Sequence, residues 1–183
     1  MMQYYRLNED VQIPNRWHVG RVRRGDRNVL DLVDGKHADS ISRLNGVVTT
    51  QGLPLRFFLT SFAVPIAVNS LGAAMERFSP NEVQLIPIEL LDVASYVVIN
   101  ITKKIDCFDE SKSQFTKWSA DDHRPDLVGK YRQVGKLRID PSGVPNNVHI
   151  FRIERWEIGT IVSMAMKQLM ESMDAFGAKF EPV

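Results

Sequence analysis

Two apolar runs near the middle of the chain, residues 83–88 and 96–101, dominate the pattern of hydrophobic and polar positions. The second run reads Tyr-Val-Val-Ile-Asn-Ile, a β-branched and aromatic series of strand length that is apolar on both faces. We therefore predict that residues 96–101 form an interior strand of a sheet. Residues 83–88 are expected to pair with this strand, because only a short connection separates the two runs.

Apolar residues recur at helical spacing on either side of these strands. In residues 61–78 the intervals are three and four, and Pro65 suits a first helical turn, so we predict an internal helix there. A second apolar stripe predicts a C-terminal helix over residues 158–176. The members of that stripe are Ile158, Val162, Ala165, Met166, Leu169, Met173 and Phe176.

Shorter apolar runs predict further strands at residues 3–7, 134–139 and 148–153. Strands are thus clustered, with helices before and after them, which predicts an α+β protein with a mostly antiparallel sheet. No repeat or linker divides the chain. We expect a single domain over residues 1–183, with the internal helix and the C-terminal helix packed on the sheet.

Composition narrows the functional classes. Hydrophobic residues make up 44% of the 183 residues and charged residues 25%, as in ordinary globular domains. The formal net charge of +1 shows neither the basic excess of a nucleic-acid binder nor the acidic excess of a nucleic-acid mimic. The N-terminus has no secretory leader pattern, and the longest mostly apolar stretch is too short to cross a bilayer, so we predict a cytoplasmic protein without a membrane span.

Residues 16–27 form the most basic segment of the protein, and they surround Trp17 with arginines. The arginines are Arg16, Arg21, Arg23, Arg24 and Arg27. Clustered guanidinium groups can neutralise phosphates or carboxylates, so one interpretation is a nucleic-acid-binding module or a patch for an acidic partner. We favour an exposed hairpin with its turn at Gly25 and Asp26 and with arginine stems covering Trp17, because no series of stacking aromatics accompanies the arginines.

The densest set of potentially reactive side chains follows Trp118. One hypothesis is a small enzyme in which Asp121 or Asp122 orients His123 as a general base while Arg124 holds an anion. Adjacent residues rarely converge on one substrate atom, so we favour a solvated loop closed by the following proline. An exposed tryptophan beside mixed charges also suits a protein-binding surface.

The sequence contains no glycine-rich phosphate loop, no nucleophile elbow and no cysteine pair. His37 and Asp39 have a spacing that supplies two metal ligands, but a metal site needs three or four convergent groups. Cys107 is the only cysteine, so no intramolecular disulfide can form, and its place at the end of an apolar strand indicates an inert buried thiol. We predict no catalytic residue, no metal and no cofactor.

The order of these features resembles the eleventh-numbered immunity-protein family of bacterial polymorphic toxin systems, formerly catalogued as a domain of unknown function. The likeness rests on an ordered set of segments more than on any one motif. The segments are residues 4–7, 14–17, 83–88, 96–100, 105–109, 137–141, 150–152 and 177–180.

The resemblance implies a cytoplasmic, non-enzymatic protein that is encoded beside a toxin and that binds and neutralises this toxin. It supplies no catalytic residues. Aromatic and arginine side chains are the usual anchors of tight protein interfaces, and the nearly balanced charge favours local complementarity over mimicry of a nucleic acid. The candidate partner-binding residues are Trp17, Trp118, Asp121, Asp122 and Arg124.

Overall fold

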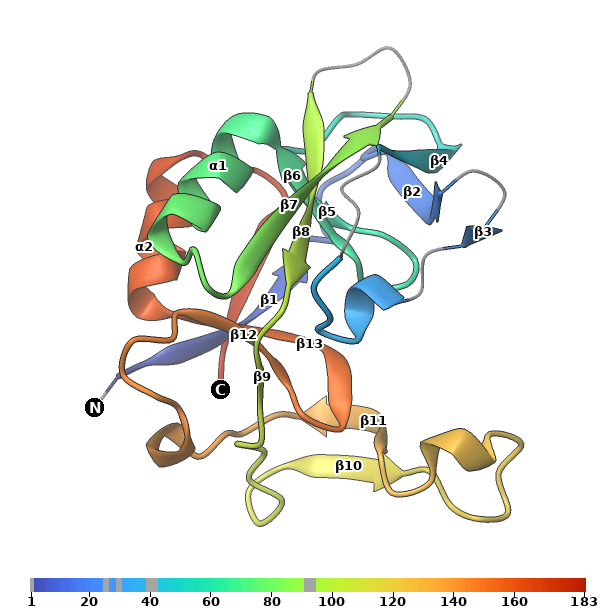
Figure 1. Cartoon of the computed structure of the whole chain (residues 1–183), viewed down its shortest axis with the longest axis vertical. Coiled ribbons are helices and arrows are strands. Elements are labelled where there is room, and N and C mark those ends of the chain that lie inside the picture. The colour runs from blue at the N-terminus through green and yellow to red at the C-terminus, as the bar shows by residue number, and fades with distance from the viewer. Residues whose placement is uncertain (1, 25–26, 29–30, 39–42, 91–94) are drawn as a thin grey trace.

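The computed structural model describes residues 2–24, 27–28, 31–38, 43–90 and 95–183. Two α-helices and three short 3-10 helices lie among the described strands (Figure 1). The helices are α1 (Asn69–Phe78), α2 (Met164–Ser172), η1 (Asp31–Val33), η2 (Pro125–Leu127) and η3 (Pro141–Gly143). The strands are β1 (Tyr4–Glu9), β2 (His18–Arg24), β3 (Arg27–Asn28), β4 (Leu44–Thr50), β5 (Phe57–Leu59), β6 (Pro65–Val68), β7 (Val83–Glu89), β8 (Tyr96–Ile101), β9 (Lys104–Ile105), β10 (Gln114–Lys117), β11 (Tyr131–Lys136), β12 (Ile150–Ile153), β13 (Trp156–Ser163) and β14 (Ala178–Pro182).

The described strands form three sheets. A seven-stranded sheet has the order β3-β2-β4-β7-β8-β6-β5, a five-stranded sheet has the order β14-β1-β13-β12-β9, and β10 pairs with β11 alone. Among the described pairings, β4 with β7 and β12 with β9 are parallel and the others are antiparallel. The predicted α+β class with mostly antiparallel pairing is therefore confirmed.

Strand β8 is interior, as its apolar pattern predicted. All six of its residues are buried, and it pairs with β7 on one side and β6 on the other. Tyr96 and Val98 face one core cluster, while Val97, Ile99 and Ile101 face another. A strand that is covered on both faces needs apolar residues at successive positions, which explains why the run does not alternate.

The internal helix is shorter than predicted, because Pro65–Val68 is strand β6 and α1 begins only at Asn69. Ile66 and Ala67 pair with Val98 and Val97 of β8. Residues 65–67 are buried at successive positions. An unbroken apolar run contains residues at every spacing, so it fits a helix as well as a buried strand. Periodicity alone does not separate the two alternatives.

The C-terminal helix is also shorter than predicted, because the first half of its stripe is strand β13. This strand lies between β1 and β12, and Ile161 and Val162 are fully buried on opposite faces of the sheet. The helix α2 starts after Ser163, whose hydroxyl accepts a hydrogen bond from the Met166 N–H at 3.2 Å as an N-cap. Residues 178–182 then form β14, a strand that the sequence did not predict.

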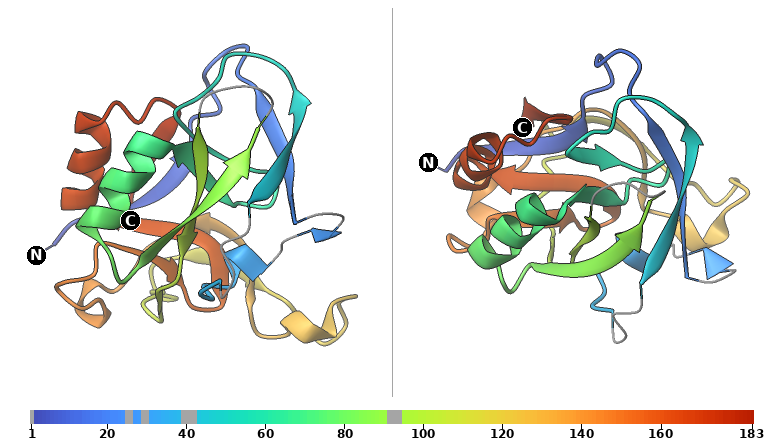
Figure 2. Two further views of the ribbon diagram at one scale, coloured as in Figure 1. Left: turned by 45° about the horizontal axis from the view of Figure 1, so that its top comes forward. Right: turned by 90° about the horizontal axis from the view of Figure 1, so that it is seen from above.

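Both helices pack on the sheets, as expected. One core cluster holds Leu71 and Met75 of α1, Met166 and Met170 of α2, and inward residues of both large sheets. Figure 2 shows the two helices side by side on one flank of the molecule. The large sheets are thereby joined through a shared apolar layer.

Candidate partner-binding surface

A two-stranded arm projects from the body of the protein. We use the name arm for residues 110–136, which contain β10, η2 and β11. Figure 1 shows the arm extending away from both large sheets. The outer part of the arm is polar and stands clear of the core, so it is available to a partner.

The base of the arm is fixed by an aromatic cluster. The rings of Phe108 and Tyr131 stack with centroids 4.0 Å apart, and Phe115 lies edge-on to both. The Tyr131 hydroxyl donates to the Glu110 carboxylate at 2.6 Å, and the Tyr131 N–H donates to the Arg155 carbonyl at 3.0 Å. Burial first, and the hydrogen bond to Glu110 second, raise the pKa of Tyr131 above its usual value. Ring packing and hydrogen bonds together hold the arm in one orientation.

Trp118 forms the centre of the outer part of the arm. The Arg132 guanidinium lies 4.7 Å from the centre of its ring, and the His123 ring approaches edge-on with centroids 5.6 Å apart. The Trp118 main chain is bonded across the arm, accepting from the Gly129 N–H and donating to the Lys130 carbonyl, each at 3.0 Å. The indole is half-buried, so part of its surface is open to a partner.

Asp122 holds the loop beside this ring. Its carboxylate accepts hydrogen bonds from the Ser119 N–H at 2.8 Å, from the Ser119 hydroxyl at 3.0 Å and from Arg132 at 2.7 Å. The bonds from Ser119, ahead of the charge of Arg132, lower the pKa of Asp122. The carboxylate therefore stays ionised and fixes the guanidinium over Trp118.

The two remaining predicted residues of the arm are exposed. Arg124 donates two hydrogen bonds to the Asp126 carboxylate, at 2.8 and 2.6 Å, and this pairing lowers the pKa of Asp126 and raises that of Arg124. In the part of the chain that the structure describes, the Asp121 carboxylate has no hydrogen bond or ion pair. The arm thus presents one free carboxylate beside one paired arginine.

The geometry does not assemble the acid–base pair of the enzyme hypothesis. His123 contacts the Trp118 ring, and within the described ranges neither Asp121 nor Asp122 hydrogen-bonds to the imidazole. Both oxygens of the Asp122 carboxylate are engaged by Ser119 and Arg132. A general base oriented by a carboxylate needs a direct hydrogen bond or one bridging water, and the loop shows no direct bond.

Trp17, the other predicted anchor, lies in the core and not on a binding surface. Its side chain is 2% exposed and packs against Phe58 and Tyr96, with ring centroids 5.2 and 5.4 Å away. Aromatic packing of this kind encloses the ring, so Trp17 offers no surface to a partner in this structure. We correct the expectation accordingly and do not carry Trp17 forward as a contact residue.

The basic segment follows the hairpin interpretation in its strands. β2 and β3 pair antiparallel, whereas the predicted turn at Gly25 and Asp26 lies outside the described residues. Phe58 and Tyr96 pack against Trp17, and Arg21 lies over the Phe62 ring. Arg16 is paired with Glu9 at 2.6 Å, which removes one positive charge from any phosphate-binding surface.

Cys107 is buried, as predicted. Burial, reinforced by the charges of Asp106 and Asp140, raises the pKa of its thiol to about 12.

The two candidate metal ligands are not seen together: His37 hydrogen-bonds to Gln84 at 3.4 Å, while Asp39 lies outside the described residues. Over the described ranges, no three metal-ligating side chains of His, Cys, Asp or Glu converge.

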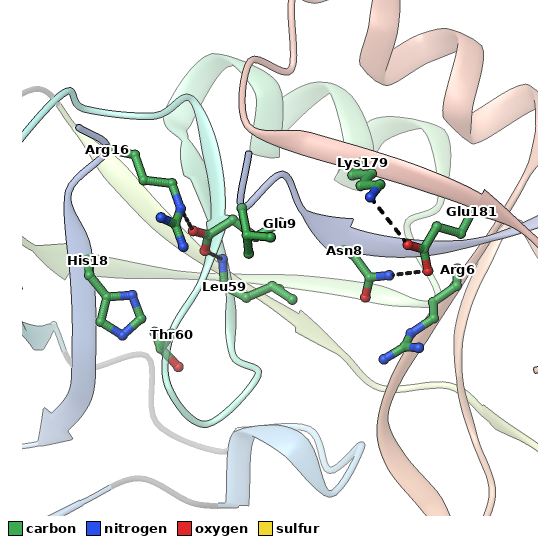
Figure 3. A pocket seen from close by; sticks show the side chains of 10 residues that line it. Arg6, Asn8, Glu9, Arg16, His18, Leu59, Thr60, Lys179 and Glu181 are labelled. Atoms are coloured by element: carbon green, nitrogen blue, oxygen red, sulfur yellow. Dashed lines mark hydrogen bonds and ion pairs between the residues drawn. The ribbon is translucent and has the colours of Figure 1, made fainter. Parts of the chain in front are cut away.

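A second polar site, which sequence reasoning did not find, is a cavity of about 390 Å³ lined by residues of β1, β2, β5 and β14 (Figure 3). On one side Glu9 accepts hydrogen bonds from Arg16 at 2.6 Å and from the Leu59 N–H at 2.9 Å. On the other side Asn8 donates to Glu181 at 2.8 Å. The cavity is assembled from four strands that are distant in sequence, so no local motif marks it.

A comparison with known protein families covers the whole arm and, of the cavity lining, only the residues of β14. Residues 78–183, which include the whole arm, match the sequence pattern of a family of immunity proteins. That family is the Immunity protein family (Imm11), and because the match covers more than half of the chain, this protein belongs to it. The resemblance noted in the sequence is thereby confirmed over β7 to β14, while the likeness at residues 4–7 and 14–17 lies outside the match.

A comparison with individually curated proteins finds no match. Among the residues that the structure describes, no helix is both long enough and apolar enough to cross a bilayer.

Proposed function

We propose that this protein is a non-enzymatic immunity protein that binds a cognate toxin and neutralises it by tight non-covalent contact. Membership of the Imm11 family supports a toxin partner. The proposal includes a toxin encoded by an adjacent gene, a cytoplasmic site of action and a single domain over residues 1–183. The antiparallel pairing of β1 with both β13 and β14 supports that last point, because it joins the two ends of the chain in one sheet.

The observation that carries the proposal is the ordered arm with Trp118 at its centre. Tight interfaces rely on a few aromatic and arginine anchors that are already held in place before binding. Trp118, supported by Arg132 and Asp122, meets that description without further rearrangement. We therefore assign the toxin contact to Trp118, Arg124 and the carboxylates of Asp121 and Asp122.

The required affinity is within reach of such a surface. An immunity protein must hold its toxin through many encounters with the target, which needs a Kd of about 1 nM or lower, or about 12 kcal/mol. An interface of roughly 800 Å² on each partner supplies this when it contains well-packed anchors. The arm alone is narrow, so neighbouring parts of the body complete the contact.

Co-expression with the toxin encoded next to this gene tests the proposal. We expect the two proteins to co-purify as a stable complex and the cells to survive toxin induction. A matched pair of variants locates the contact: Trp118→Ala is expected to weaken protection, whereas Phe176→Ala, which removes an exposed ring beyond α2, leaves it intact. Failure of the wild-type pair to co-purify, together with no protection, contradicts the proposed function.

A further inference from the structure

The Arg6 guanidinium is the least engaged charged group in the cavity of Figure 3. Its carbon lies 4.8 Å from the centre of the Trp156 ring, and the side chain lines the cavity. Figure 3 shows the guanidinium turned toward the space between the Glu9 group and the Glu181 group, with no dashed line to it. Among the described residues it forms no hydrogen bond and no ion pair.

The carboxylates of the same cavity already have partners. Glu9 is held by Arg16 and by the Leu59 N–H. Glu181 is held by Asn8 and lies 3.6 Å from Lys179. Neither carboxylate is therefore free to turn to Arg6 without losing an existing bond, so the N–H donors of Arg6 face the cavity.

Arg6 is also prepared for a ligand before one arrives. It is half-buried, and the loss of hydration lowers the pKa of its guanidinium, although the charge of Glu181 acts in the opposite direction. The guanidinium lies over the Trp156 ring, a cation–π contact that favours this position of the donor group. A desolvated and oriented guanidinium gains more from a charged acceptor than a flexible surface arginine does.

We propose that this cavity receives the carboxylate of an acidic side chain of the partner protein, with Arg6 as the group that binds it. The inference rests on the proposed function and adds a second docking point, distinct from the arm. It names the chemistry of the toxin surface: an aspartate or glutamate that projects far enough to enter the cavity.

The charge of the cavity selects a carboxylate over a phosphate. Three cationic and two anionic side chains line it, a formal excess of one positive charge when His18 is neutral. One monoanion balances that excess, whereas a phosphate dianion exceeds it and is repelled more strongly by the carboxylates of Glu9 and Glu181. The planar fork of Arg6 also matches the two oxygens of a carboxylate. Nucleic acid is disfavoured on the same grounds.

Titration of the full-length protein with a hexaglutamate peptide tests the inference, with hexaglutamine and inorganic phosphate as comparison probes. The side-chain Nε–H resonance of Arg6 and the amide resonances of Asn8 and Lys179 are followed by NMR. We expect a saturable shift with hexaglutamate, none with hexaglutamine, and weaker binding of phosphate. Arg6→Gln is expected to weaken hexaglutamate binding by about fivefold or more, and Arg6→Lys, which keeps the charge and loses the fork, by less.

Arg21→Gln is the matched control, because Arg21 is exposed on β2 and does not line the cavity. Three results overturn the inference: no saturable shift at peptide concentrations up to about 10 mM, equal losses in the Arg6 and Arg21 variants, or tighter binding of phosphate than of hexaglutamate. The backbone spectrum of each variant shows whether it is folded, and Arg6→Lys keeps the test decisive if Arg6→Gln unfolds. Since no toxin is used, failure here leaves the proposed function standing, and failure to bind a toxin leaves this result standing.

Discussion

The polar side chains of this protein work differently in two regions: beneath the segment of residues 31–38, which we call the strap, and on the arm. Under the strap, Asn100 is 0% exposed and donates to the Lys36 carbonyl and to Gln84, each at 2.9 Å. Gln84 in turn donates to the Ala38 carbonyl and accepts from its N–H, both at 2.9 Å. On the arm, polar groups bond to one another and keep one side toward solvent.

A second buried group ties the strap to the other large sheet. Arg152 on β12 is 0% exposed and donates to the Leu32 carbonyl at 3.2 Å and to the Glu157 carbonyl at 2.6 Å. Burial lowers the pKa of its guanidinium to about 10, against the attraction of Asp34 and Glu157. Buried polar groups with fixed partners specify one packing arrangement, whereas exposed pairs contribute little to stability. Stability thus depends on the strap contacts, and we propose that recognition depends on the arm.

Arg152→Ala should produce the largest effect on stability, because it removes the contacts between β12 and the strap. The change removes the donor to the carbonyls of Leu32 and Glu157 and opens a cavity in the core, so we expect a loss of about 3–5 kcal/mol in the free energy of unfolding. Urea denaturation measures it. Arg152→Met keeps most of the volume and should cost less; a loss below about 1 kcal/mol for the alanine variant would contradict the assignment of stability to the strap.

Two tryptophans give the next prediction, because one lies in each kind of environment. Trp118→Ala should weaken toxin binding by about 2–4 kcal/mol while changing the unfolding free energy by less than about 1 kcal/mol. Trp17→Ala should do the reverse, because its enclosed ring contributes to the core and not to the surface. Calorimetric titration with the toxin and urea denaturation of each variant separate the two effects. Equal losses of stability in the two variants would contradict the assignment of Trp17 to the core and of Trp118 to the surface.

The same pair of residues shows what the sequence was able to predict. Both tryptophans lie among charged residues, so local pattern did not distinguish them. Trp17 is enclosed by Phe58 and Tyr96, which come from segments far along the chain. Burial that depends on such distant contacts is invisible to periodicity, and the surface role predicted for Trp17 was wrong for that reason.

A strand or helix was predicted correctly where its apolar pattern fitted only one kind of element. Strand β8 and its pairing with β7 followed from an apolar run with no polar face. The starts of α1 and α2 did not, because each helix directly follows a buried strand and the apolar stripe continues through both elements. The outer part of the arm, residues 118–126, was predicted as a loop with candidate contacts, and the strand predicted at residues 134–139 is found at 131–136 as β11. The role of Arg132, ten residues beyond Asp122, depends on the β10–β11 pairing, which the sequence did not predict.

Asn100→Ala should give a smaller loss than Arg152→Ala, since it removes a shorter side chain and one donor group. The Lys36 carbonyl loses its hydrogen bond, so we expect a decrease of about 1–3 kcal/mol in the unfolding free energy. Hydrogen exchange of the Ala38 amide should accelerate in this variant, because Gln84 loses the partner that orients it. Unchanged exchange at Ala38 would show that the strap does not depend on Asn100.

Alkaline pH should produce the smallest effect, through the thiol of Cys107 at the junction of body and arm. The main-chain carbonyl of Cys107 accepts a hydrogen bond from the Asp140 N–H at 2.7 Å there. The thiol has its usual pKa of 9.0 when unfolded and about 12 when folded, so between these values the folded chain keeps a proton that the unfolded chain releases. Stability from this group is complete below pH 9 and falls as pH rises, by about 1.4 kcal/mol at pH 10.

Cys107→Ala removes this titration, so the difference in unfolding free energy between the wild type and the variant should shrink between pH 8 and pH 10. Urea denaturation at both values measures the change. The rate at which a thiol reagent modifies Cys107 at pH 8 measures how often the base of the arm opens, because Cys107 lies where the arm leaves the body. If modification is as slow as global unfolding, the base of the arm is part of the body and only its outer loop is free for recognition. If modification is much faster, the arm opens by itself, and the preformed surface that we assign to toxin binding would be lost with it.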